Sequence, residues 1–147
     1  MNYDKPLNLL KSFPRKLNNF YFKNSKYSFK VKNKSKDKKI YDPVTNLDKA
    51  FEKFIRNTIV KQFPEDAILG EEFLEKYSDN DFKWYIDPID GTRAFMVGAP
   101  TWSNLIGLTH KDQPVLGLAN FPALNKVYTN DQKKSYLINN KKTILKT

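Results

Sequence analysis

The chain has 147 residues, a length that suits one domain, and a formal net charge of +10. Its content of Leu, Ile, Val and Phe exceeds the roughly 20% below which disorder is usual. The absence of cysteine excludes a disulfide scaffold, a thiolate zinc site and cysteine catalysis, and a single histidine excludes a multi-histidine metal centre. Because no apolar run approaches the ~20 residues of a membrane span and the first residues lack a signal peptide's apolar core, we expect a soluble, cytoplasmic protein.

The basic residues gather at the two ends of the chain. Residues 1–41 carry twelve Lys and Arg against Asp4 and Asp37, whereas residues 42–130 carry more acidic than basic residues. The N-terminal run contains no recognisable nucleic-acid-binding motif. We interpret it as a solvated, lysine-rich face, with nonspecific attraction of anions as the alternative. Neither a specific nucleic acid nor a membrane is expected as a partner.

Residues 1–35 are predicted to form a basic, weakly helical N-terminal segment. Apolar residues at Leu7, Leu9, Leu10, Leu17, Phe20 and Phe22 could line one face of a helix. Pro14 predicts that any such helix is interrupted, because proline removes a backbone donor and clashes with the preceding turn. Further on, Phe29 and Val31 alternate with lysines as in a short edge strand.

The clearest helix is predicted to begin after Thr45. Thr45 is suited to cap the helix, and Asp48 follows three residues later, which is an aspartate version of the capping box. One apolar face then follows at helical spacing, made of Leu47, Phe51, Phe54, Ile55 and Ile59. Pro64 predicts that the helix ends near Gln62.

After this helix the apolar pattern changes to that of strands. Strands are expected at residues 67–69, 84–86, 102–109, 114–120, 125–129 and 135–138, with turn-forming residues between several of them. Short successive strands joined by tight turns predict an antiparallel meander. The expected fold class is therefore α+β, with helices packed on a mostly antiparallel sheet.

Four acidic residues lie where predicted elements begin or end: Asp48, Glu71, Asp87 and Asp90. Each has an ordinary structural explanation. Asp48 could be a stabilising acid at a helix start, Glu71 could belong to a plain loop, and Asp87 and Asp90 could form side-chain turns. Their joint order and spacing make these separate explanations less satisfactory, because element ends on one edge of a sheet gather side chains into a site.

The segment Asp87-Pro88-Ile89-Asp90-Gly91-Thr92 carries the most chemical information. Two carboxylates three residues apart on a bend would repel each other, so a cation is their natural partner. With oxygen ligands alone, that cation should be hard, and Mg²⁺ is favoured over Ca²⁺ or Mn²⁺. Gly91 allows a close backbone approach, and the amides of Gly91 and Thr92 would bind phosphate if a helical turn starts there, although Thr92 could also be only a cap. The segment therefore indicates a phosphate ester as ligand.

Residues 42–48 (Asp-Pro-Val-Thr-Asn-Leu-Asp), 70–72 (Gly-Glu-Glu) and 84–92 (Trp-Tyr-Ile-Asp-Pro-Ile-Asp-Gly-Thr) together resemble the inositol monophosphatase family. The resemblance runs from about Lys36 to Asn140 and implies the N-terminal half of a layered αβαβα sugar-phosphatase fold.

The family resemblance also implies a role for each matching residue. The Mg²⁺ ligands would be Glu71, Asp87, Asp90 and the carbonyl of Ile89. Asp48 and Thr92 would orient and activate the attacking water, and the amides of Gly91 and Thr92 would hold the substrate phosphate.

Within the family, residues 91–95 and 98–102 look most like bacterial histidinol-phosphate phosphatases, with an inositol-phosphate phosphatase as the alternative. Arg93 could contact a polar or anionic substrate group or be an ordinary surface arginine, and Trp102 is interpreted as a core aromatic rather than a substrate platform. The family's long N-terminal helix has only a Pro14-broken counterpart here. Its second half, with a Trp-Asp-x-Ala motif that supplies another metal ligand, has no counterpart up to Thr147.

We therefore expect residues 36–147 to form the metal- and phosphate-binding domain of a Mg²⁺-dependent phosphomonoesterase, with the C-terminal half absent. The expected partners are a small phosphorylated metabolite and either a second copy of the chain or the missing half. The main alternative is a catalytically incompetent fragment or remnant that keeps the metal motif. A third hypothesis is nucleic-acid or phospholipid binding by the basic ends, but it would need an organised basic groove.

Overall fold

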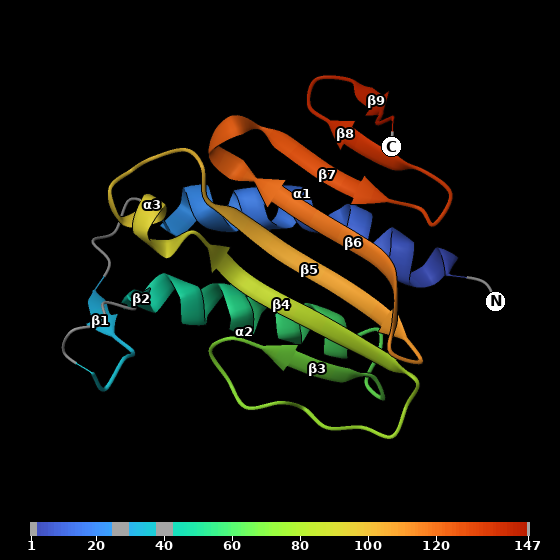
Figure 1. The fold of residues 1–147 in the computed structure, drawn as a ribbon, viewed down its shortest axis with the longest axis horizontal. Helices are drawn as coiled ribbons and strands as arrows, with labels where there is room; N and C mark the ends of the chain where they lie inside the picture. Colours follow the sequence, from blue (N-terminus) through green and yellow to red (C-terminus); the bar gives the residue numbers. More distant parts are fainter. Residues whose placement is uncertain (1–2, 25–29, 38–42, 147) are drawn as a thin grey trace.

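The computed structural model describes residues 3–24, 30–37 and 43–146. Two long helices lie side by side against one face of a seven-stranded sheet (Figure 1). The predicted strand residue Phe29 and the first motif residue Asp42 lie outside the described residues. No helix in the described ranges is both long and apolar enough to cross a membrane.

Helix α1 (Asp4–Asn24) continues through Pro14, so the predicted interruption is wrong. Four of its side chains, Leu9, Leu10, Phe13 and Leu17, are at most 2% exposed. Burying each contributes about 1.5–3 kcal/mol, so the four together outweigh the ~3 kcal/mol that proline costs within a helix. Contacts with the rest of the core therefore keep this segment helical.

Helix α2 (Asn46–Val60) begins as the sequence predicts. The Thr45 hydroxyl accepts hydrogen bonds from the amides of Leu47 and Asp48, and the Asp48 side chain accepts from the amide of Thr45, which completes the capping box. Just before the helix, β1 (Val31–Asn33) and β2 (Pro43–Thr45) pair antiparallel as a separate two-stranded sheet.

The large sheet confirms the predicted antiparallel meander. Its strands follow chain order: β3 (Ala67–Gly70), β4 (Phe82–Asp90), β5 (Ser103–His110), β6 (Gln113–Phe121), β7 (Lys126–Asn130), β8 (Ser135–Ile138) and β9 (Lys142–Ile144). Only the β3–β4 pair among them is parallel. The one-turn helices α3 (Thr92–Met96) and η1 (Pro122–Leu124) follow β4 and β6. Strand β9 was not predicted from the sequence.

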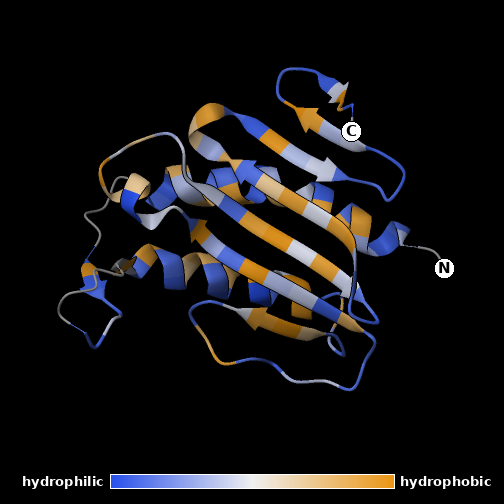
Figure 2. Ribbon diagram, in the orientation of Figure 1, coloured by the Kyte–Doolittle hydropathy of each residue, from blue (hydrophilic) through white to orange (hydrophobic). Residues whose placement is uncertain are grey.

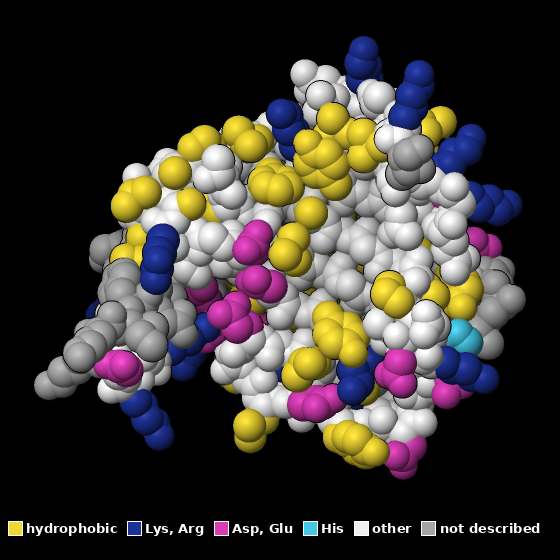
Figure 3. Space-filling model, in the orientation of Figure 1, with side chains coloured by type: hydrophobic (Ala, Val, Ile, Leu, Met, Phe, Trp, Pro, Cys, Tyr) yellow, Lys and Arg dark blue, Asp and Glu magenta, His cyan; other side chains and the backbone are white. Residues whose placement is uncertain are grey.

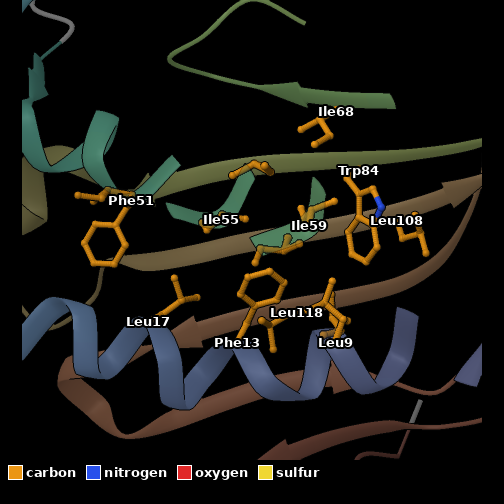
Figure 4. Close-up of a cluster of buried hydrophobic side chains, with 14 of the residues drawn as sticks. Leu9, Phe13, Leu17, Phe51, Ile55, Ile59, Ile68, Trp84, Leu108 and Leu118 are labelled. Carbon is orange, nitrogen blue, oxygen red and sulfur yellow. The ribbon is translucent and has the colours of Figure 1, made fainter. Parts of the chain in front are cut away.

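The main core lies between the two helices and the sheet. Figure 4 shows Phe13 and Leu17 of α1 and Phe51, Ile55 and Ile59 of α2 converging on strand residues from β3 to β6. Trp102 is 2% exposed and packs against Phe51 and Phe95, which confirms it as a core aromatic. Residues of α1 and α2 thus share one core, which holds the start of α2 close to the end of β4.

The opposite face of the sheet carries no helix from the described residues (Figure 1). Along several strands of the sheet, hydrophobic and polar residues alternate, as Figure 2 shows. Two shallow, mainly apolar hollows lie on this face. One is lined by residues of β5 to β8, and the other, which includes Glu71, Tyr85, Asp87 and Leu105, borders the acidic residues described next.

Candidate functional site

A bulge at the end of β4 places Asp87 and Asp90 on the same side of the strand. Asp87 pairs with Leu105 of β5, and Asp90 pairs with Ser103, two residues away on that strand. Three steps along β4 therefore match two steps along β5, so the usual alternation of side chains is shifted by one residue. Pro88 suits this position, because a bulge can accept a residue without an amide hydrogen.

Asp48 joins the start of α2 to the residue that follows β4. Its side chain is fully buried, and its Oδ2 atom accepts hydrogen bonds from the amide and hydroxyl of Thr45, at 2.8 Å and 2.5 Å. Its Oδ1 atom lies 3.4 Å from the hydroxyl of Thr92, which also lies 3.1 Å from the carbonyl oxygen of Ile89. Burial raises the pKa of Asp48, against the lowering effect of the Thr45 hydrogen bonds.

Lys34, just after β1, contacts the two glutamates that follow β3, Glu71 and Glu72. The Lys34 Nζ atom lies 2.8 Å from Glu71 Oε1 and forms a second ion pair with Glu72. Burial lowers the pKa of Lys34, but hydrogen bonds to these two glutamates and their charges outweigh burial and raise it. The interpretation of the N-terminal basic run as a solvated, lysine-rich face is therefore wrong for Lys34.

Asp87 is the most perturbed carboxyl group of the site. Its pKa is raised to about 7, first by desolvation, then by the charge of Glu71 and hydrogen bonding with it, and then by the charge of Asp90. Its Oδ1 atom is buried and has no hydrogen-bond partner among the described residues. A buried carboxylate oxygen without a donor, beside two further acids, is a position that a cation would stabilise.

The donor set fits a hard divalent cation in its chemistry. Glu71, Asp87 and Asp90 offer only carboxylate oxygens, which are the ligands Mg²⁺ prefers. Within the described ranges, however, no three acidic, histidine or cysteine side chains are already arranged to hold a metal ion. Lys34 holds Glu71, and the Ser103 hydroxyl donates to Asp90 Oδ2 at 3.1 Å. Cation binding would therefore require these carboxylates to exchange partners.

The predicted phosphate-binding residues lie directly after these acids. Gly91 has a φ of +83°, a backbone conformation that glycine adopts without strain. Gly91 is the N-cap of α3, so the alternative that Thr92 is the cap is wrong. The first amides of a helix have no acceptor within the helix and can bind an anion. Arg93 is exposed on α3. Figure 3 shows acidic side chains gathered on the surface beside the end of β4.

Sequence reasoning missed a chain of buried asparagines that supports the bulge. The side-chain amide of Asn104 donates to the carbonyl oxygen of Pro88 at 2.7 Å. Asn120 in turn donates to the side-chain oxygens of Asn104 and Asn18, at 2.9 Å and 3.0 Å. Asparagines on two strands give no local signal of such a network, because each contact joins residues at least 16 positions apart.

Comparison with known protein families shows to which family the chain belongs. The model of the inositol monophosphatase family matches residues 16–147, which is most of the chain. The chain belongs to the inositol monophosphatase family. The resemblance found in three short motifs is thereby confirmed over nearly the whole sequence.

Individual family members show how the chain relates to whole proteins. A histidinol-phosphatase from Chlorobaculum parvum is 46% identical over 86 residues, covering 58% of this chain and 33% of that protein. The Nus factor SuhB from Haemophilus influenzae is 38% identical over 124 residues, covering 84% of this chain and 46% of that protein. The chain thus spans about a third to a half of the length of these curated relatives.

Solved structures confirm the expected fold. The SuhB protein of Bartonella henselae superposes with a TM-score of 0.81 at 24% identity, covering 89% of this chain and 51% of that one. An IMPase/NADP phosphatase complexed with Mg²⁺ and phosphate gives 0.78 at 20% identity, covering 90% and 51%. Coverage of about half of each solved chain fits the expectation that this sequence corresponds to the N-terminal half of the family.

Proposed function

We propose that the chain forms the metal- and phosphate-binding part of a Mg²⁺-dependent phosphomonoesterase. The observation that carries this proposal is the placement of Asp87 beside Glu71 and Asp90, with one buried oxygen that has no donor in the described part of the chain. Family membership supports it. So does the Mg²⁺ and phosphate in the complex of the IMPase/NADP phosphatase, a protein of the same fold.

The proposed ligands are the carboxylates of Glu71, Asp87 and Asp90 and the carbonyl oxygen of Ile89. When bound there, Mg²⁺ would supply positive charge that offsets the phosphate charge and lowers the pKa of a nearby water. The chain's own contribution is to hold these oxygens at one end of β4, where the bulge brings both aspartates to one side.

Asp48 and Thr92 are the proposed pair that positions the attacking water. If the Thr92 hydroxyl donates its hydrogen to Asp48 Oδ1, the Thr92 oxygen keeps lone pairs that can accept a hydrogen from water. The Thr45 hydrogen bonds fix the other oxygen of Asp48, so the carboxylate cannot rotate freely. The amides of Gly91 and Thr92 at the start of α3 would receive the phosphate oxygens, and Arg93 could contact the rest of the substrate.

The favoured substrate is histidinol phosphate, with an inositol phosphate as the second choice. The support is the 46% identity to a histidinol-phosphatase, which is higher than the 31% identity to a fructose-1,6-bisphosphatase/inositol-1-monophosphatase from Aquifex aeolicus. Both substrates are small phosphate monoesters, so the same proposed metal and phosphate contacts serve either one.

Phosphate release from a panel of monoesters tests this proposal. The 147-residue chain, alone and joined to the C-terminal half of a histidinol-phosphatase, would be assayed with Mg²⁺ and with a chelator. We expect Mg²⁺-dependent release from the joined protein that is lost in Asp90→Asn. If the joined protein folds but releases no phosphate from any monoester, the chain is a noncatalytic remnant and the proposal is wrong.

A further inference from the structure

A second buried carboxylate, Glu52, lies one turn beyond Asp48 on α2. Its side chain is fully buried, and its Oε1 atom accepts a hydrogen bond from Arg56 Nε at 2.7 Å. A glutamate is almost never fully buried without such a partner. Neither the capping of α2 nor the proposed phosphatase chemistry uses this residue.

The Glu52 carboxylate binds the backbone that follows Glu71. Its Oε2 atom accepts the amide hydrogen of Glu72 at 2.6 Å, and its Oε1 atom accepts that of Phe73 at 3.3 Å. Hydrogen bonds to a charged acceptor are among the strongest in proteins. Two of them on consecutive amides fix the course of the chain as it leaves Glu71.

Gly70 makes this close approach possible. A Cβ atom on Gly70 would lie 2.1 Å from Glu52 Oε1, closer than real Cβ atoms approach other atoms. The backbone of Gly70 has no positive φ, so the requirement is for space rather than for an unusual conformation. The glycine before Glu71 and the buried glutamate on α2 therefore form one structural unit.

We propose that Glu52 is a positioning residue that sets the place of the metal ligand Glu71 relative to Asp48. This inference rests on the proposed function, because it assumes that Glu71 binds the cation. Glu52 does not touch the cation or the substrate. It acts through the backbone, by tying the loop after β3 to the same helix that carries Asp48.

The negative charge of Glu52 is essential to this role. In Glu52→Gln one terminal oxygen becomes an NH₂ group, which cannot accept a hydrogen bond. One of the amides of Glu72 and Phe73 then loses its acceptor, and the pairing with Arg56 weakens. Loss of an outer partner of a metal ligand typically lowers metal affinity about 10- to 100-fold.

The test is calorimetric titration of Mg²⁺ into the 147-residue chain and its variants. We expect the Kd for Mg²⁺ to rise at least about tenfold in Glu52→Gln, and hydrogen exchange at the amides of Glu72 and Phe73 to accelerate. Asp66→Asn is the matched control. Asp66 is also a buried carboxylate, but it accepts from Trp84 Nε1 and Asn80 Nδ2, away from Glu71. This control should lower thermal stability while the Kd stays within about twofold of wild type.

The outcomes separate this inference from the proposed function. If Glu71→Gln and Asp87→Asn bind Mg²⁺ like wild type, the proposed metal site itself is wrong. If those variants lose affinity but Glu52→Gln keeps it, or if Asp66→Asn loses as much, the positioning role of Glu52 is overturned. Should Glu52→Gln fail to fold, Gly70→Ala, which displaces the same carboxylate, answers the same question with the same thresholds.

Discussion

At Asp48 the two carboxylate oxygens have different partners. Oδ2 accepts from Thr45 at the helix start, and Oδ1 lies beside the Thr92 hydroxyl. The structural and catalytic explanations of this residue are therefore compatible. Substitutions can separate them, because a cap affects the free energy of unfolding, whereas a water-positioning pair affects turnover.

Asp48→Asn weakens the capping box of α2, and Thr92→Ala removes the hydroxyl contacts with Asp48 and Ile89. For each we predict a stability loss of about 0.5–2 kcal/mol. In a protein joined to the C-terminal half of a relative, turnover should fall at least about 100-fold, because the attacking water loses its acceptor. Thermal unfolding and phosphate release would be measured on the same samples. A loss of stability with turnover preserved would leave both residues with a purely structural role.

The raised pKa of Asp87 predicts that the free energy of unfolding depends on pH. Its pKa is about 7 in the folded chain against an ordinary value of 3.8, so the folded state binds more protons than the unfolded state between these values. The free energy of unfolding should therefore fall as pH rises from about 4 to about 7, and this loss is complete above pH 7.

Thermal unfolding without divalent cations, followed from pH 5 to pH 8, checks this expectation. The wild-type midpoint should fall with rising pH, and added Mg²⁺ should restore it at pH 8. Asp87→Asn removes the titrating group and should flatten the profile. A wild-type midpoint that rises over this range, or the same slope in both proteins, would contradict the assignment to Asp87.

At the scale of elements, the bulge at the end of β4 depends on the asparagine network. Asn104→Ala leaves the Pro88 carbonyl and a side-chain amide hydrogen of Asn120 without a partner, which we predict to cost about 1–3 kcal/mol. The affinity for Mg²⁺ should also fall, because Asp87 and Asp90 flank the loosened segment. Chemical denaturation and Mg²⁺ titration measure the two effects.

Asn130→Ala is the matched control for this prediction. Asn130 also bonds backbone groups, namely the Gly117 amide and the Val115 carbonyl, but it lies on β7. It should therefore lose stability without losing Mg²⁺ affinity. Equal losses of affinity in both variants would show that the network acts only through general stability.

Local signals predicted many of the elements correctly, and long-range contacts explain the errors. The capping box of α2 and the strands of the meander depend on neighbouring residues, so the sequence reveals them. The continuity of α1 through Pro14 depends on burial against the sheet, which proline rules do not include.

The same distinction holds for the candidate site. The order of its acidic residues was predictable from short motifs. The contacts of Lys34 with Glu71 and of Glu52 with the amide of Glu72 join residues 37 and 20 positions apart, and no local pattern signals them. The one-residue bulge that turns Asp87 and Asp90 to one side is likewise a property of strand pairing.

At the scale of the whole molecule, the candidate site borders a sheet face that no described helix covers. Open solvent at the site weakens electrostatic stabilisation, because water screens the charges that stabilise the transition state. We therefore predict little or no hydrolysis of histidinol phosphate or inositol phosphate by the 147-residue chain. Joining it to the C-terminal half of a relative should restore Mg²⁺-dependent turnover.

The assay compares phosphate release by the purified 147-residue chain and by the joined protein, with mass and oligomeric state verified. Asp90→Asn in the joined protein controls for contaminating phosphatases. Robust Mg²⁺-dependent hydrolysis by the 147-residue monomer would show that the site needs no further cover.

The most direct test of the central claim is Mg²⁺ binding by the carboxylates at the end of β4. Calorimetric titration of the 147-residue chain should give measurable binding, and the Kd should rise at least about tenfold in both Asp87→Asn and Asp90→Asn. Circular dichroism would verify that both variants keep the fold. Folded variants that bind Mg²⁺ with the wild-type affinity would contradict the account.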